Sequence, residues 1–156
     1  MKKCLALVLF FSALTGFAQS DALRNRDYNL NKGVAINGYD PVGYFTEHKA
    51  LKGKKELASA YHGVIYYFAS AADKEAFGTA PSKYEPQYGG WCAYAMGHDG
   101  SKVEVDPETF KIIDGKLFLF YNRLFTNTLK SWNLDETKLH NQADANWQKL
   151  FPLQPK

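Results

Sequence analysis

The sequence Tyr61-His62-Gly63-Val64-Ile65-Tyr66-Tyr67-Phe68-Ala69-Ser70 decides the fold of the central part of this chain. Val64–Phe68 is an unbroken run of β-branched and aromatic residues, which predicts a strand that is buried on both faces. His62-Gly63 separates this run from residues 57–61, and glycine accepts the positive φ of a tight turn. The stretch therefore predicts two paired strands joined by a short turn.

A short helix is expected directly after the second strand. The Ser70 hydroxyl can cap its first turn, and Asp73 lies three residues further on, near the positive end of the helix dipole. Phe77 belongs to a short apolar stripe at helical spacing. Gly78 and Pro81 are residues at which such a helix ends. The central unit is thus a hairpin followed by a helix and an extended return.

The segments before this unit carry weaker signals. Residues 20–33 could form a short helix or remain a loose arm. Residues 34–45 are expected to be extended, because Asn37-Gly38 favours a turn and Pro41 disfavours a helix.

The segments after the central unit predict strands and then helices. Residues 91–96 predict a strand, and residues 97–100 a hairpin connection. Residues 110–121 contain the clearest hairpin of the chain, since Asp114-Gly115 is a favoured two-residue turn. Residues 123–132 are expected to be helical, with a loosely common apolar face formed by Leu124, Phe125, Leu129 and Trp132. In a second helix, apolar residues recur at helical spacing, namely Leu139, Ala143, Trp147 and Leu150.

Residues 1–18 have the features of an export signal. Lys2-Lys3 precede a mostly apolar run at residues 5–14 that is too short to span a bilayer comfortably. Gly16-Phe17-Ala18 places small residues at the positions that a signal peptidase requires, which predicts cleavage before Gln19. We therefore expect the mature protein in the periplasm or secreted, without stable membrane insertion.

Composition favours one well-packed domain. The chain has 156 residues, of which 46% are hydrophobic and 15% aromatic, which argues against disorder. The formal net charge of +3 falls to +1 when Lys2 and Lys3 are removed with the signal, so nucleic acid is not expected as a partner. Cys4 is removed as well. Cys92 would then be the only cysteine, and no intramolecular disulfide can form.

Several blocks resemble the YHS domain family: Tyr66-Tyr67-Phe68-Ala69-Ser70-Ala71, Lys74, Phe77 and Pro81-Ser82-Lys83-Tyr84. Residues 37–45 and 89–94 are similar to a secreted bacterial branch of that family, and the similarity continues through residues 114–117 to 143–147. The resemblance implies a treble-clef-like α+β unit. We therefore expect a single α+β domain at residues 19–156, with a small antiparallel sheet, a core at about 37–122 and a helical C-terminal region at 123–151.

The resemblance also points to metal handling. Some relatives occur in copper-transporting pumps, where paired cysteines are the proposed ligands. Ala69 and Asp73 stand at the positions of those cysteines in this chain, and alanine cannot bind a metal ion. The resemblance therefore does not supply a thiolate pair here.

Cys92 is the first candidate for chemistry. On a strand, Cys92, Tyr94, Met96 and His98 would share one face. Thiolate, thioether and imidazole together suit copper better than magnesium or calcium, so Cys92, Met96 and His98, with His62, form a candidate site for copper or another transition-metal ion. The alternative is that Cys92 and Met96 are core residues and that His62 is a surface residue of its turn.

A second candidate set would contact a small ligand through aromatic groups. It consists of Tyr39, Tyr67, Trp91 and Tyr94, whose polar ring atoms could orient a ligand in a pocket. Ordinary core packing, with each hydroxyl at the rim, is the alternative.

The sequence favours an exported, non-catalytic YHS-type binding protein that holds a metal ion or small ligand near Cys92. Motifs for serine hydrolysis, phosphate binding, dithiol redox chemistry and zinc proteolysis are absent from the sequence. One alternative is a structural or interaction module that docks a partner through aromatic residues. Another is a thiol enzyme or redox sensor, which requires Cys92 to be accessible.

Overall fold

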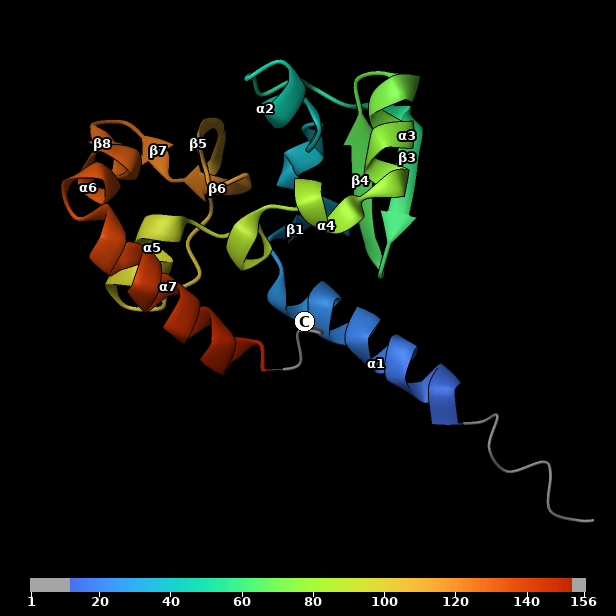
Figure 1. The fold of residues 1–156 in the computed structure, drawn as a ribbon, viewed down its shortest axis with the longest axis horizontal. Coiled ribbons are helices and arrows are strands. Elements are labelled where there is room, and N and C mark those ends of the chain that lie inside the picture. Colours follow the sequence, from blue (N-terminus) through green and yellow to red (C-terminus); the bar gives the residue numbers. More distant parts are fainter. Residues whose placement is uncertain (1–11, 153–156) are drawn as a thin grey trace, which may run out of the picture.

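The computed structural model describes residues 12–152 (Figure 1). In chain order the elements are α1 (Ser12–Asp27), β1 (Leu30–Asn31), β2 (Val34–Ala35), the 3-10 helix η1 (Ile36–Gly38), α2 (Gly43–Thr46), β3 (Lys54–Tyr61), β4 (Val64–Phe68), α3 (Ala71–Thr79), α4 (Pro81–Tyr84), the 3-10 helix η2 (Gln87–Gly90), α5 (Ala93–His98), β5 (Asp106–Ile113), β6 (Lys116–Phe120), β7 (Asn122–Arg123), β8 (Thr126–Asn127), α6 (Thr128–Leu134) and α7 (Glu136–Leu150). This is the α+β class that the sequence predicts, while the treble-clef-like geometry stays a prediction.

Figure 1 shows two groups of elements, with α4 and η2 between them. The first group contains β3, β4 and α3, and the second contains β5 to β8 with α5, α6 and α7. Helix α3 packs on β3 and β4, whereas α5 packs on α7 and β6. The chain therefore joins a sheet covered by a helix to a second group built on two hairpins and three helices.

The predicted turn at His62-Gly63 is confirmed. Both residues have positive φ, and Tyr61 pairs with Val64 across the antiparallel β3–β4 hairpin. The prediction that β4 is buried on both faces is wrong, because fully buried residues alternate with half-buried ones along the strand. The strand order is β1-β2-β4-β3, and β2 pairs with β4 in parallel, so this sheet is mixed rather than purely antiparallel.

The predicted cap of α3 is also confirmed. The Ser70 Oγ accepts a hydrogen bond from the Asp73 backbone N–H at 3.1 Å. The Phe77 ring of this helix packs on β4, with its centroid 4.7 Å from that of Tyr66 and 5.2 Å from that of Phe68. Burying a phenyl ring in this way contributes about 1.5–3 kcal/mol to stability.

A buried carboxylate joins the segment before α2 to the end of β4. Asp40 is fully buried, and its two oxygens accept hydrogen bonds from the backbone N–H groups of Val42 at 2.8 Å and Ala69 at 2.7 Å. Burial raises the pKa of this carboxyl group. The surrounding segment is not extended as predicted, because η1 and α2 interrupt residues 34–45.

The predicted Asp114-Gly115 hairpin is confirmed by the pairing of Ile113 with Lys116 in β5 and β6. Phe118 and Phe120 of β6 are fully buried. Their rings pack on Trp132 of α6, with centroids 5.9 and 5.5 Å away. This aromatic group forms the centre of the second half of the fold.

The predicted strand at residues 91–96 is wrong, because α5 occupies Ala93–His98. The Cys92 carbonyl accepts a hydrogen bond from the Met96 N–H at 3.0 Å, which closes a helical turn. Tertiary packing favours the helix: Gly97 lies so close to α7 that a Cβ atom there would be 2.4 Å from the Leu139 carbonyl oxygen. Residues 97–100 are accordingly the end of this helix rather than a hairpin connection.

The helix predicted at residues 123–132 begins only at Thr128. Strands β7 and β8 precede it and form a small hairpin, with Leu124 and Phe125 in its turn. These two side chains are 95% and 105% exposed, so the proposed common face with Trp132 is wrong.

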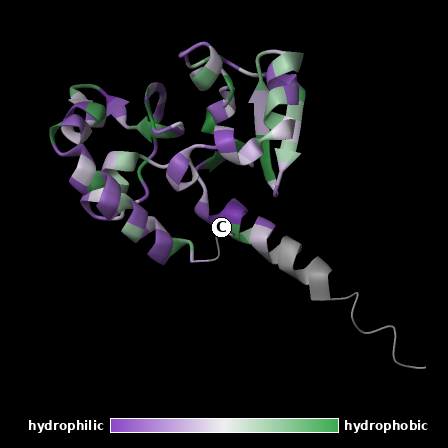
Figure 2. Ribbon diagram, in the orientation of Figure 1, coloured by the Kyte–Doolittle hydropathy of each residue, from purple (hydrophilic) through white to green (hydrophobic). Residues whose placement is uncertain are grey.

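The second C-terminal helix is confirmed as α7. Leu139, Ala143 and Trp147 are buried, while Leu150 is 39% exposed. Figure 2 shows α7 as a mostly hydrophilic helix with a few hydrophobic positions.

For residues 20–33, the structure shows the helical alternative, because α1 extends to Asp27. Residues 1–11, most of the predicted export signal, and with them Cys4, lie outside the described part of the chain. Within residues 12–152, no helix combines the length and the apolar character that a membrane span requires.

Candidate functional site

Cys92 lies between η2 and α5 and is fully buried. Its backbone N–H donates to the Val103 carbonyl at 2.9 Å. Its Sγ lies 3.4 Å from the Thr128 Oγ1 and accepts a hydrogen bond from the Tyr121 N–H at 3.4 Å. The sulfur is therefore closed to bulk solvent but has polar neighbours.

A second hydrogen bond of the Thr128 hydroxyl determines which group donates the proton in its contact with the Cys92 sulfur. It donates to the Tyr121 carbonyl oxygen at 2.9 Å. Because a hydroxyl carries one proton, its oxygen is left to accept from the Cys92 S–H group. A metal ion bound to the thiolate would displace this proton and leave Thr128 in place as a donor to the backbone.

A cavity of about 240 Å³ borders Cys92. Its walls include Tyr94 and His98, whose rings stack with centroids 5.6 Å apart and an interplanar angle of 26°. The remaining lining residues are Ala95, Asp99, Ser101, Val103, Tyr121 and Thr128. Three predicted site residues thus line one cavity, although they do so from a helix and its N-cap and not from the expected strand.

The structure places the other two predicted metal ligands elsewhere. Met96 is fully buried, and it is not among the residues that line this cavity. His62 lies in the β3–β4 turn, with its Nδ1 3.4 Å from the Asp21 Oδ1. Among residues 12–152, no group of three or more histidine, cysteine, aspartate or glutamate side chains is arranged to hold a metal ion.

The predicted aromatic ligand contacts hold elements of the fold together. The Tyr39 hydroxyl donates to the Glu108 Oε1 at 2.9 Å, and the Trp91 Nε1 donates to the Asp27 carbonyl at 2.6 Å. Tyr67 lies against Gly53, where a Cβ atom would be 2.5 Å from the tyrosine backbone. Of this set, Tyr94 is the residue found in the wall of the cavity at Cys92.

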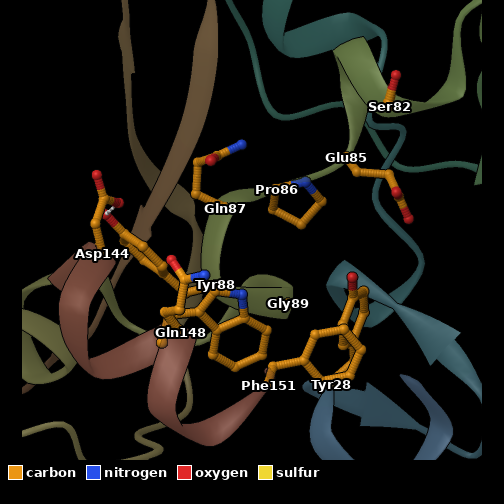
Figure 3. A pocket seen from close by; sticks show the side chains of 11 residues that line it. Tyr28, Ser82, Glu85, Pro86, Gln87, Tyr88, Gly89, Asp144, Gln148 and Phe151 are labelled. Atoms are coloured by element: carbon orange, nitrogen blue, oxygen red, sulfur yellow. Dashed lines mark hydrogen bonds between the residues drawn. The ribbon is translucent and has the colours of Figure 1, made fainter. Parts of the chain in front are cut away.

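A larger cavity of about 440 Å³ was missed by reasoning from the sequence (Figure 3). It lies between α7 and the segment that joins α4 to η2. Its lining residues are Tyr28, Ser82, Glu85, Pro86, Gln87, Tyr88, Gly89, Asp144, Trp147, Gln148 and Phe151. No local pattern links residues this far apart in sequence, so the cavity could be found only from the tertiary structure.

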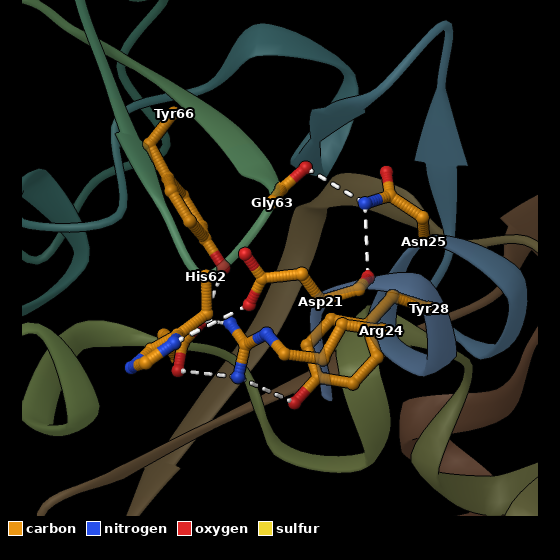
Figure 4. A network of polar contacts seen from close by, with 8 residues as sticks. Asp21, Arg24, Asn25, Tyr28, His62, Gly63 and Tyr66 are labelled. Atoms are coloured by element: carbon orange, nitrogen blue, oxygen red, sulfur yellow. Dashed lines mark hydrogen bonds and ion pairs between the residues drawn. The ribbon is translucent and has the colours of Figure 1, made fainter. Parts of the chain in front are cut away.

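A buried ion pair supports one wall of the larger cavity (Figure 4). Arg24 of α1 donates to Glu85 through both terminal nitrogens, and it also donates to the Tyr28 hydroxyl at 3.0 Å. The Tyr66 hydroxyl donates to the same Glu85 carboxylate. Burial, followed by the charge of Glu85, raises the pKa of Tyr66, so this hydroxyl stays a donor.

The same network fastens α1 to the β3–β4 hairpin. The Asn25 Nδ2 donates to the Gly63 carbonyl at 3.0 Å, beside the contact between Asp21 and His62. Figure 4 shows these groups at the hairpin turn. The first turns after the predicted cleavage site are therefore part of the folded structure.

A family model for the YHS domain matches residues 42–88. This region runs from the residue before α2 to Tyr88 of η2, so it contains the β3–β4 hairpin, α3 and α4. The chain thus contains a YHS domain, as the resemblance indicated. No curated protein and no solved structure matches the chain.

Proposed function

We propose that this protein is an exported, non-catalytic YHS-type binding protein that holds a copper ion at Cys92. The observation that carries the proposal is that Cys92 and His98 line the same cavity. Thiolate and imidazole are suitable ligands for Cu(I), which is bound by soft sulfur donors. The presence of a YHS domain supports this proposal, because relatives with this domain occur in copper-transporting proteins.

The burial of the thiol suits such a site. A side chain with no exposed area reacts slowly with oxidants in an extracytoplasmic compartment, and the adjoining cavity is the side from which a metal ion would approach the sulfur. His98 has 61% of its side chain exposed, and its Nδ1 lies 3.5 Å from the Asp99 Oδ2. Its Nε2 is therefore the atom that would face a metal ion.

Export is the second part of the proposal. It rests on Lys2-Lys3, on the short apolar run after them and on Gly16-Phe17-Ala18. N-terminal sequencing of the protein recovered from the periplasm or medium of its host tests this part, and a chain that still begins at Met1 contradicts it.

Anaerobic titration with Cu(I) against a chromophoric chelator tests the metal site. The Cys92→Ser variant should lose the site, and His98→Gln should weaken it. Met96→Leu is the matched control, since it conserves volume in the core and should leave copper affinity unchanged. The metal proposal is refuted if Cys92→Ser binds copper as tightly as the wild type.

A protein-interaction module is a second candidate, favoured by the turn of the β7–β8 hairpin. Leu124 and Phe125 are 95% and 105% exposed there, and adjacent exposed apolar side chains are typical of contact surfaces. A photo-crosslinking residue at position 125 should capture a specific partner in the host. Labelling that is unchanged when Leu124 is replaced by serine would count against this candidate.

A further inference from the structure

The larger cavity has a floor of closely packed aromatic rings. Trp147 stacks on Phe151 with centroids 5.4 Å apart and an angle of 12°, and Tyr28 packs on both at 6.0 and 5.6 Å. Gly89 makes this possible, because a Cβ atom there would be 2.7 Å from the Tyr28 ring and 3.0 Å from Trp147. The result is a rigid apolar surface at the base of the cavity.

The walls of the cavity are polar and acidic. Figure 3 shows Asp144 and Gln148 on one side, Gln87 above and Glu85 on the other side. Two carboxylates line it, and none of its described lining residues is a lysine, arginine or histidine. Arg24 offsets the charge of Glu85 from behind, so Asp144 supplies the net negative charge.

The Asp144 carboxylate is held in position and is accessible. The Tyr88 hydroxyl donates to its Oδ1 at 2.9 Å. Burial, followed by the charge of Asp144, raises the pKa of Tyr88, so the hydroxyl remains protonated. Tyr88 itself has a φ of 55°, a conformation that is uncommon for a bulky residue, and its ring packs on Phe118 and Trp147. The other carboxylate oxygen, Oδ2, lies 3.8 Å from the His140 Nε2, which is longer than a hydrogen bond, and 60% of the Asp144 side chain is exposed. Oδ2 can therefore still accept a hydrogen bond from a ligand.

We propose that this cavity binds a small organic cation, with its ammonium group at Asp144 and its apolar part over Trp147 and Tyr28. Negative charge beside an aromatic floor attracts cations and repels anions. A volume of about 440 Å³ lies within the range of about 300–1,000 Å³ typical of small-molecule sites. The site shares no lining residue with the cavity at Cys92, so it goes beyond the copper proposal.

Isothermal titration calorimetry with charged and neutral ligands of the same shape tests the proposal. Choline is compared with 3,3-dimethylbutanol, and butylammonium with butanol, using the full protein as its host produces it. A charged hydrogen bond or ion contact of about 1.4 kcal/mol corresponds to a tenfold change in affinity. We expect at least one cation to bind about tenfold or more tightly than its neutral counterpart.

Two charge-matched variants locate the site. Asp144→Asn should weaken binding of the cation about tenfold and leave the fold intact, because the position is largely exposed and asparagine still accepts from Tyr88. Asp114→Asn removes the same charge at the exposed β5–β6 turn, where asparagine is equally well accommodated, and should not change affinity. Cys92→Ser should also bind the cation normally, which separates this test from that of the copper site.

Three results would overturn the inference. They are equal affinity for each cation and its neutral counterpart, no binding of either cation at concentrations up to about 10 mM, and equal loss of affinity in the Asp144 and Asp114 variants. Preferential binding of glucose, tested in parallel, would also overturn it, because the cavity would then recognise a neutral sugar. If Asp144→Asn does not fold, the comparison of each cation with its neutral counterpart on the wild-type protein decides whether the cavity prefers cations.

Discussion

Replacing Gly97 with alanine should destabilise the protein, although alanine is the better helix former. Gly97 lies in α5, and a Cβ atom there would be 2.4 Å from the Leu139 carbonyl oxygen, 3.0 Å from its carbonyl carbon and 3.2 Å from its Cα. All three atoms belong to the backbone of α7, so no change of side-chain rotamer can relieve the contact. The two helices would have to separate by about 1 Å to restore ordinary van der Waals distances.

Two opposing terms determine how much Gly97→Ala changes the free energy of unfolding. The change from glycine to alanine favours a helix by about 1 kcal/mol. Forcing an extra methyl group into a packed interface costs about 1–3 kcal/mol, and the upper part of this range applies because the obstacle is backbone. The expected net loss is therefore about 1–2 kcal/mol, or a decrease in Tm of about 2–8 °C for a domain of this size.

Gly78→Ala in α3 is the matched control. A Cβ atom at Gly78 would meet no atom within 4 Å, so the same chemical change adds helix propensity without a clash. This variant should be about 0.5–1 kcal/mol more stable than the wild type. Urea denaturation followed by circular dichroism measures both variants under one set of conditions. If Gly97→Ala is as stabilising as Gly78→Ala, the argument that α5 and α7 pack too closely at Gly97 to admit a methyl group is refuted.

Two further predictions concern carboxylates that tie distant segments together. Asp40→Asn should lower the free energy of unfolding by about 1–3 kcal/mol. The two Asp40 oxygens accept from two buried backbone N–H groups at 2.8 Å or less, and asparagine would turn an N–H group of its own toward one of these donors. An unchanged urea midpoint would contradict this. Hydrogen bonds from Arg26 and Lys102 lower the pKa of Asp27 below 3.8, although its burial acts in the opposite direction. The stability that Asp27 provides is thus present above its ordinary pKa and is lost as the pH falls through its lowered value in the folded state. Lys102→Met should therefore cost more stability at pH 7 than at pH 2, as measured by urea unfolding, and an equal cost at both pH values would refute this account.

Local signals were sufficient for the elements whose sequence specifies one conformation. His62-Gly63 and Asp114-Gly115 tolerate the positive φ of a tight turn, and both turns occur where predicted. The Ser70 cap of α3 and the apolar stripe of α7 depend only on residues within a few positions of each other. Such features can be predicted from sequence because the interacting groups are neighbours in the chain.

The wrong predictions fall where local preference is ambiguous and packing decides. Residues 91–96 contain aromatic residues that favour a strand and alanines that favour a helix, and contact with α7 at Gly97 selects the helix. At Leu124 and Phe125, apolar residues suggested a buried helical face, whereas they lie exposed in a turn. The sequence pattern predicted that Cys92, Tyr94 and His98 lie near one another, which the shared cavity bears out, but it assumed the wrong element. It could not bring Glu85 and Asp144 together, because 58 residues (86–143) separate them.

Helices α5 and α7 each line one of the two cavities, so the independence of the two sites can be tested at the contact between these helices. Helix α5 carries Tyr94 and His98 of the cavity at Cys92, whereas α7 carries Asp144 of the larger cavity. The two helices are joined by the contact at Gly97 and by the hydrogen bond from the Asn146 Nδ2 to the Met96 carbonyl at 2.9 Å. Separating them with Gly97→Ala should weaken copper and cation binding together, while Cys92→Ser and Asp144→Asn should each affect one ligand alone. If Gly97→Ala alters neither affinity in protein that remains folded, the spacing of these helices does not determine the shape of either cavity.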